Sequence, residues 1–297
     1  MGWHMGYSIL STFWGTATCT TALIVLALVV VRPRTAYCDA SVPGAIPAES
    51  SGSITLTVLY DNYSYSEHLK TGWGFSCLID GLEKTILFDT GGRGLILLDN
   101  MRKLGLNPDE IDIVVLSHNH YDHTGGLRAF LVENNNVQVF VPVSFPERFK
   151  RQVSALGASV VSVSGGSEIC EGAWSTGQLG IGVREHALCL DTSDGLFVVT
   201  GCAHPGVLRM IESARKLSPV GVSGVMGGFH MKGFSAKQIG RIVEGLRETG
   251  ISVALPCHCS GDLTRQMMCQ SFTSEYGRVG VGATLELGPG ARTSIQG

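Results

Sequence analysis

One stretch near the middle of the chain reads Ser117-His118-Asn119-His120-Tyr121-Asp122-His123-Thr124-Gly125-Gly126-Leu127. The preceding segment, residues 111–116, is short and rich in apolar β-branched residues, which predicts a buried strand. Residues 125–133 can form a helix, with Thr124 as its cap. The histidines therefore lie in a loop at the C-terminal end of a strand, where α/β folds usually build their sites.

This histidine loop carries side chains that bind transition metals. His118 and His120 alternate in an extended segment and can point the same way. Asp122 and His123 follow as the chain turns into the helix, at a second position nearby. Imidazole nitrogen and carboxylate oxygen suit zinc, iron and manganese. The two pairs predict two metals a few ångströms apart; a polar loop that only caps a helix is the alternative.

Two later strands also end at histidines. Residues 195–200 lead to Cys202 and His204, and residues 251–255 lead to His258, which stands between two cysteines. Both segments repeat the order strand, histidine, helix. We therefore expect His204 and His258 to bind metal.

Other histidines are weaker candidates. His230 follows a strand predicted at 220–225 and could bind metal, transfer a proton or contact a phosphate. His186 could be a ligand, but a partly buried polar histidine is the favoured interpretation. His68 lies in a polar loop and is interpreted as a surface residue rather than a substrate contact.

The motif His-x-His-x-Asp-His after an apolar strand resembles the signature of the metallo-β-lactamase superfamily. The other matching stretches are 74–79 (GFSCLI), 86–91 (ILFDTG), 200–206 (TGCAHPG), 227–230 (GGFH) and 258–261 (HCSG). Together they are similar to one branch, the 7,8-dihydropterin-6-methyl-4-(β-D-ribofuranosyl)aminobenzene-5'-phosphate synthases of methanopterin biosynthesis. The resemblance runs from about Ile54 to about Leu287.

The resemblance implies an α/β fold, an αββα sandwich of two mixed β-sheets flanked by helices. It also implies two divalent metal ions; zinc suits the ligand types best, with iron and manganese as alternatives. The ligands expected for the first metal are His118, His120 and His204, and those for the second are Asp122, His123 and His258.

The resemblance implies a role for Asp89 and for Cys202, and we add two catalytic candidates. Asp89, in the Asp-Thr-Gly turn, is expected to orient the histidine loop by hydrogen bonds. Cys202 stands where many members have an aspartate that bridges the metals, so a bridging thiolate and a buried spectator thiol both remain open. Asp122 and His230 are the expected catalytic residues, His230 through substrate contact or proton transfer.

Three functions are compatible with these residues. The first is a hydrolase, in which metal-activated water attacks an ester, a phosphoester or a related bond. The second, implied by the branch, is a transferase that joins a hydroxymethyl-dihydropterin diphosphate to an aminobenzene ribonucleotide. The third is a non-catalytic metal-binding module attached to the membrane. We expect a small-molecule substrate, phosphorylated or a pterin.

Composition narrows the class of protein. Charged residues make up 16% of the chain and the formal net charge is −3, so no nucleic-acid partner is expected. The nine cysteines are odd in number and lack the spacing of a disulfide framework. We interpret most of them as reduced thiols that are buried or near the metals.

The first part of the chain has a different composition. No charged residue precedes Arg32, and the stretch from Ile9 to Val31 is long enough to span a bilayer as a hydrophobic helix. We favour a membrane anchor over residues 1–34, with the rest of the protein on the cytoplasmic side because arginines follow the helix. A cleaved signal peptide with an exported product, or a mis-assigned start codon, are the alternatives. Residues 35–53 are predicted to be a linker and 54–297 the catalytic domain.

Overall fold

The computed structural model describes residues 53–272 and 279–288. The hydrophobic helix predicted at 9–31 and nearly all of the linker predicted at 35–53 lie outside the described residues. Within the described ranges, no helix has both the length and the apolar character needed to cross a membrane.

Seven strands form the first sheet, in the order β13-β1-β2-β3-β4-β5-β6. Their bounds are β1 (Ile54–Tyr60), β2 (Ser76–Asp80), β3 (Ile86–Phe88), β4 (Ile113–Val115), β5 (Gln138–Pro142), β6 (Ser159–Val163) and β13 (Thr284–Leu287). Strands β3 to β6 run parallel, whereas β13, β1, β2 and β3 pair antiparallel. The sheet is therefore mixed, and its parallel half carries the histidine loop after β4.

The second sheet has six strands in the order β12-β11-β10-β9-β8-β7. Their bounds are β7 (Ser167–Cys170), β8 (Ala173–Ser175), β9 (Leu188–Thr192), β10 (Gly195–Thr200), β11 (Val222–Gly228) and β12 (Val253–Cys257). Strands β10, β11 and β12 are parallel and the rest antiparallel. Their carboxyl ends therefore lie at one edge of the sheet, the edge that carries the later histidines.

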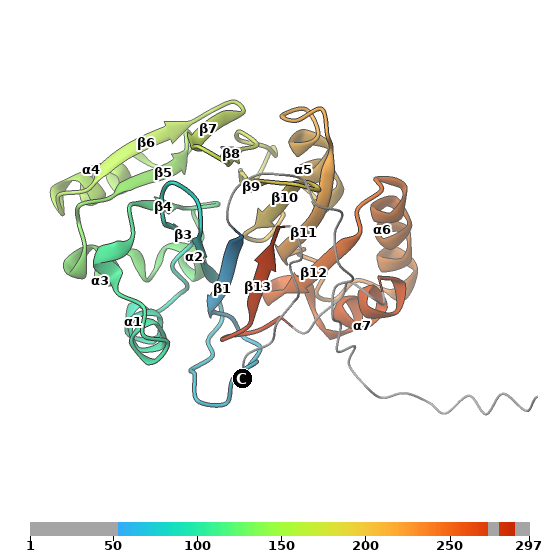
Figure 1. Cartoon of the computed structure of the whole chain (residues 1–297), viewed down its shortest axis with the longest axis horizontal. Coiled ribbons are helices and arrows are strands. Elements are labelled where there is room, and N and C mark those ends of the chain that lie inside the picture. The colour runs from blue at the N-terminus through green and yellow to red at the C-terminus, as the bar shows by residue number, and fades with distance from the viewer. Residues whose placement is uncertain (1–52, 273–278, 289–297) are drawn as a thin grey trace, which may run out of the picture. The chain divides into compact units, whose positions relative to one another are not determined.

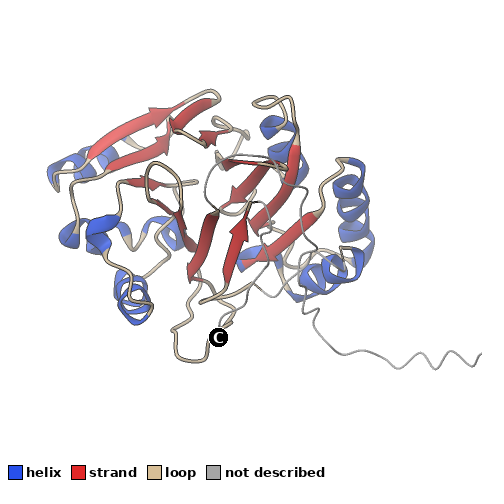
Figure 2. Ribbon diagram, viewed as in Figure 1, coloured by secondary structure: helices blue, strands red, loops and turns tan. Residues whose placement is uncertain are grey.

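Helices cover the outer face of each sheet (Figures 1 and 2). Those on the first sheet are α1 (Gly94–Lys103), α3 (Leu127–Glu133) and α4 (Glu147–Ala155). Those on the second are α5 (Val207–Ala214), α6 (Ala236–Glu248) and α7 (Asp262–Ser271). Short helices occupy the loops: α2 (Tyr121–Thr124), η1 (Pro108–Glu110) and η2 (His258–Ser260).

The two apolar cores explain why β4 is apolar at every position. Ile113 and Val115 belong to the core that the two sheets enclose. Val114 and Leu116 face the opposite way and belong to the core beneath α1, α3 and α4. A strand buried on both faces needs apolar residues of both parities, as is usual in parallel sheets.

The structure confirms the predicted α/β architecture of two mixed sheets flanked by helices. One local prediction was wrong. Thr124 does not cap a helix that starts at residue 125, because it is the last residue of α2 and its hydroxyl donates to the His120 carbonyl (3.0 Å). The chain turns helical earlier than predicted, at Tyr121, and Gly126 precedes α3.

Candidate metal centre

The candidate ligands converge from both sheets. The loop after β4 supplies His118, His120, Asp122 and His123 from the first sheet. The loops after β10 and β12 supply His204 and His258 from the second. Residues far apart in the sequence meet here because parallel strands deliver their following loops to the same edge.

Three imidazoles form the first group of donors. His118 Nε2 lies 3.1 Å from His120 Nδ1. The His204 ring lies 4.8 Å, between centroids, from each of these two rings. His118 is completely buried, whereas His120 and His204 are partly exposed, so the group opens toward the surface on one side.

The second group combines one carboxylate with two imidazoles. Asp122 Oδ2 lies 3.3 Å from His258 Nε2 and 3.7 Å from His123 Nε2. His123 and His258 are buried, and Asp122 is partly exposed. The donors thus lie in two adjoining groups, which we call the triads, and the His118 and His123 rings are 4.2 Å apart between centroids.

Cys202 lies between the triads. Its sulfur is 3.2 Å from His123 Nε2. The same sulfur lies within 4.8 Å of donor atoms of His118 and His204 and, in a second group, of His123 and His258. The Cys259 sulfur is 3.3 Å away. Both thiols are free, as was predicted for most of the cysteines. The thiol therefore occupies the central position between the two triads.

Asp89 holds the histidine loop as predicted. Its Oδ1 accepts the Ser117 backbone N–H (2.7 Å), and its Oδ2 accepts the Ser117 hydroxyl (2.7 Å) and lies 2.6 Å from His123 Nδ1. The hydrogen bond to Nδ1 leaves Nε2 of His123 directed to the centre. Although burial lowers the pKa of His123, the Asp89 carboxylate and the other acids raise it overall.

Sequence reasoning missed Glu185, which organises the loop after β10. This fully buried carboxylate accepts four consecutive backbone N–H groups, from Gly201, Cys202, Ala203 and His204, at 2.8–3.1 Å. Burial raises the pKa of Glu185 to about 7, although these hydrogen bonds lower it in part. No motif pointed to it, because its partners are backbone groups that any sequence would supply.

His258 has its own support from the end of β1. Its Nδ1 lies 2.9 Å from Asn62 Oδ1, and its backbone N–H donates to Asp61 Oδ2 (3.3 Å). Asp61 is fully buried, which raises its pKa to about 6. An acidic residue directly after a buried strand was the signal that could have revealed this contact.

Residues with a strained backbone lie close to the donors. Four residues other than glycine have a left-handed backbone within the described ranges: Asp89, Ala203, His230 and His258, with φ between 46° and 54°. Each follows a strand that ends at the donor cluster. Such conformations cost about 1–3 kcal/mol each and concentrate at functional sites, where surrounding contacts hold them.

The protonation states of three of the donors suit cation binding. Burial, and then neighbouring histidines, lower the pKa of His118 well below its usual value and that of His204 to about 4, so both are neutral near pH 7. Partial burial raises the pKa of Asp122, but His258 and His123 outweigh it and lower the pKa overall. Neutral imidazoles and an ionised carboxylate are the forms that coordinate metals.

Two buried nitrogens show that these residues fit a metal. His204 Nε2 and His258 Nε2 are inaccessible to solvent; His204 Nε2 has no hydrogen-bond partner, and His258 Nε2 faces Asp122 Oδ2 at 3.3 Å. A buried polar atom without a partner costs about 1–3 kcal/mol. A cation held between the donors would satisfy both nitrogens.

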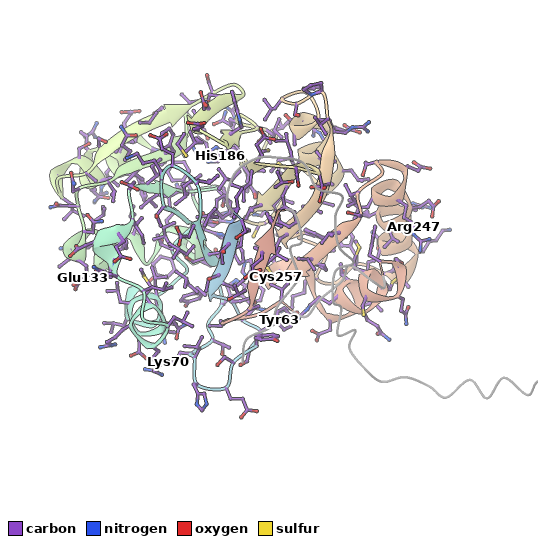
Figure 3. The ribbon with its side chains drawn as sticks, viewed as in Figure 1. Tyr63, Lys70, Glu133, His186, Arg247 and Cys257 are labelled. Atoms are coloured by element: carbon purple, nitrogen blue, oxygen red, sulfur yellow. The ribbon has the colours of Figure 1, made fainter. Side chains whose placement is uncertain are left out.

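The other three predicted histidines, His230, His186 and His68, lie outside the triads. His230 is exposed at the rim, with its ring 4.2 Å from that of His204. His186 is buried in the interior (Figure 3), where Nδ1 lies 2.7 Å from the Ser175 hydroxyl and Nε2 lies 3.0 Å from the Leu116 carbonyl. His68 is exposed and belongs to no donor cluster among the described residues. His186 is thus fully buried rather than partly buried as predicted, and both of its ring nitrogens have hydrogen-bond partners.

Known proteins share this fold and site region. Residues 74–204 match the metallo-β-lactamase superfamily. The chain is 28% identical over 284 residues to 7,8-dihydropterin-6-methyl-4-(β-D-ribofuranosyl)-aminobenzene-5'-phosphate synthase of Methanocaldococcus jannaschii, covering 79% of this chain and 97% of that protein.

Solved structures of similar fold agree with this sequence match. Tm1679, a metal-dependent hydrolase of the β-lactamase superfamily, superposes with a TM-score of 0.66 at 26% identity and covers 79% of this chain and 99% of its own. The metallo-β-lactamase fold protein YhfI from Bacillus subtilis shares the fold, with a TM-score of 0.59 at 14% identity over 79% of this chain and all of its own. The chain contains a metallo-β-lactamase superfamily domain.

Proposed function

We propose that this protein is an enzyme that holds two divalent cations side by side, through the triads His118, His120, His204 and Asp122, His123, His258. The observation that carries the proposal is the buried His204 Nε2, which has no partner, together with the buried His258 Nε2 that faces the Asp122 carboxylate at 3.3 Å. Zinc suits these ligands best, with iron and manganese as alternatives.

Such ions, when bound, lower the pKa of a coordinated water and polarise the oxygen of a bond about to break. The chain's own residues supply the rest. His230, exposed beside His204, is placed to exchange a proton with a leaving group. Asp122 is ionised near pH 7 and partly exposed, so it can hold a cation and orient a nucleophile at the mouth of the centre.

Hydrolysis of an ester, a phosphoester or a related bond is the reaction that this arrangement supports best. Transfer of a dihydropterin group from its diphosphate to an aminobenzene ribonucleotide is the second candidate, and the methanogen synthase favours it. Both reactions expel a group whose developing negative charge a cation can stabilise; in hydrolysis water attacks a carbonyl carbon or a phosphorus, whereas in the transfer an amine attacks the methylene carbon of the pterin and diphosphate leaves.

Metal content tests the centre directly. The full chain, purified without chelator, should contain close to two transition-metal ions, and His120→Ala or Asp122→Ala should lose at least one. His68→Ala is the matched control, because this exposed histidine lies outside the triads and should keep both ions. Full metal content in both triad variants would refute the assignment.

Product analysis separates the reactions. The metal-loaded chain would be incubated with a hydroxymethyl-dihydropterin diphosphate, with and without the aminobenzene ribonucleotide, and with phosphoester, thioester and lactone substrates. Diphosphate release that requires the amine, with a product of the summed mass less diphosphate, identifies the transferase. Cleavage without the amine identifies the hydrolase. A chain that binds two metals and turns over none of these substrates would support a metal-binding module.

A further inference from the structure

Three aromatic side chains of the described ranges are exposed, and one of them lies against the metal centre. Trp73 is 49% exposed, Tyr121 is 73% exposed and Phe234 is 37% exposed. Tyr121 stands between two of the metal-binding side chains in the sequence, and Phe234 follows His230 by one turn. An exposed aromatic ring beside candidate metal ligands offers a surface on which a ligand with an apolar face can pack.

Trp73 packs against one of the donors. Its ring centroid lies 4.9 Å from that of His258. The next residue, Gly74, has φ +142°, and a side chain there would collide with the Asp122 carbonyl. The Phe75 N–H donates to that same carbonyl (3.3 Å). The backbone thus holds the indole against the second triad while leaving half of its surface exposed.

Lys232 places a positive charge over the same indole. Its ammonium lies 4.7 Å from the Trp73 ring centroid. Its backbone N–H donates to the Cys259 carbonyl (3.1 Å), which fixes the residue beside the loop that carries His258. The side chain itself is exposed and has a flexible four-carbon stem. The ammonium can therefore move from the indole to an arriving anion and uncover the ring face.

We propose that Trp73 and Lys232 form a subsite for a planar heteroaromatic substrate that carries a phosphate or diphosphate. The planar ring stacks on the indole, and the ammonium pairs with the anionic group beside the metal-binding triads. This inference rests on the proposed function and specifies its substrate class. Aliphatic esters and lactones would leave the indole face unused.

Calorimetric titration of the zinc-loaded full chain tests the subsite. The probes are 6-hydroxymethylpterin, its diphosphate and inorganic diphosphate. Trp73→Leu should weaken both pterin probes by about tenfold or more, as expected for a lost stacking partner, and should not weaken inorganic diphosphate. Lys232→Met should weaken the two diphosphate probes by about tenfold and should not weaken the unphosphorylated pterin, for which it uncovers the indole face.

Two variants provide matched controls. Trp174→Phe changes a tryptophan on β8, away from the strand ends that carry the donors, and Lys216→Met removes an exposed lysine beyond the far end of α5. Both should bind all three probes like the wild type. Thermal unfolding of every variant shows that each is folded, and Trp73→Phe should recover part of the pterin affinity lost in Trp73→Leu.

Several outcomes would overturn the subsite: wild-type affinities in both test variants, binding of inorganic diphosphate but of neither pterin, or equal weakening of the unphosphorylated pterin by Lys232→Met. Metal content measured on the same samples separates the two proposals. Two bound metals without pterin binding would refute only the subsite. Pterin binding that depends on Trp73 in a chain unable to hold metal would refute only the proposed function.

Discussion

Cys202 and His204 are two residues apart on one loop, but we expect them to act differently. Each triad has three donors without the sulfur, so Cys202→Ser should keep both metals and substantial activity. His204→Ala should abolish activity and lower the metal content, because it removes one of three donors. Metal analysis and turnover decide the matter, with Cys202→Asp as a third variant that restores a carboxylate. Metal loss in Cys202→Ser with retention in His204→Ala would make the cysteine the ligand.

His186 should make stability depend on pH. Burial lowers its pKa from 6.5 to about 4. Between these values the unfolded chain binds a proton that the folded chain does not, so stability is present above pH 6.5 and is lost as the pH falls toward 4. The shift corresponds to about 3 kcal/mol at most.

The His186→Gln variant isolates this contribution. Glutamine can still accept from Ser175 and donate to Leu116 but does not titrate. In denaturant titrations, its free energy of unfolding should fall less steeply than that of the wild type from pH 6.5 to 4.5. His68→Gln, at an exposed position, should keep the wild-type slope. An unchanged slope in His186→Gln would contradict the assignment.

At the scale of the element, α6 offers a matched pair of glycines. A side chain at Gly240 would meet only Met267 Cε, at 3.9 Å, whereas one at Gly245 would lie 2.7 Å from Leu208 Cδ1 on α5. Gly240→Ala should therefore stabilise the protein by up to about 1 kcal/mol through helix propensity. Gly245→Ala should gain less or destabilise, because Leu208 must move. Thermal unfolding of both variants checks the packing of α6 on α5, and equal gains would contradict it.

At the scale of the whole molecule, metal binding should join the two sheets. Each triad combines donors from the loop after β4 with a histidine that follows β10 or β12. Metal at 100 times its Kd should add about 2.7 kcal/mol per site to the stability of the folded chain. A chelator should therefore lower the Tm of the wild type. It should lower the Tm of His120→Ala by a smaller amount, because that variant holds less metal. If the chelator left the Tm of the wild type unchanged, a metal that links the two sheets would be excluded.

The N-terminal segment also concerns the whole molecule. We propose that residues 9–31, which lie outside the described residues, attach the protein to a membrane because the stretch is uncharged and long enough to span a bilayer. The full chain should sediment with membranes, and a chain starting at residue 53 should remain in the supernatant. A mature protein that begins near residue 39 or 41 would instead establish a signal peptide.

Much of the fold was readable from the sequence. Local pattern predicted β1 over Ile54–Tyr60 with its observed bounds, and placed β4 before the histidine loop. The same pattern indicated that His204 and His258 follow strands. These predictions succeeded because apolar periodicity and the residue types at strand ends are local properties of the chain.

The tertiary structure alone decided how the centre is held together. Glu185 lies 16 to 19 residues from the four N–H groups that it accepts, and Asn62 lies 196 residues from His258. Trp73 became notable only when its ring was found exposed beside His258. The sequence by itself determined which side chains could bind a metal. Their supports and their neighbours depend on how the two sheets pack, and burial and long-range hydrogen bonds leave no periodic signal along the chain.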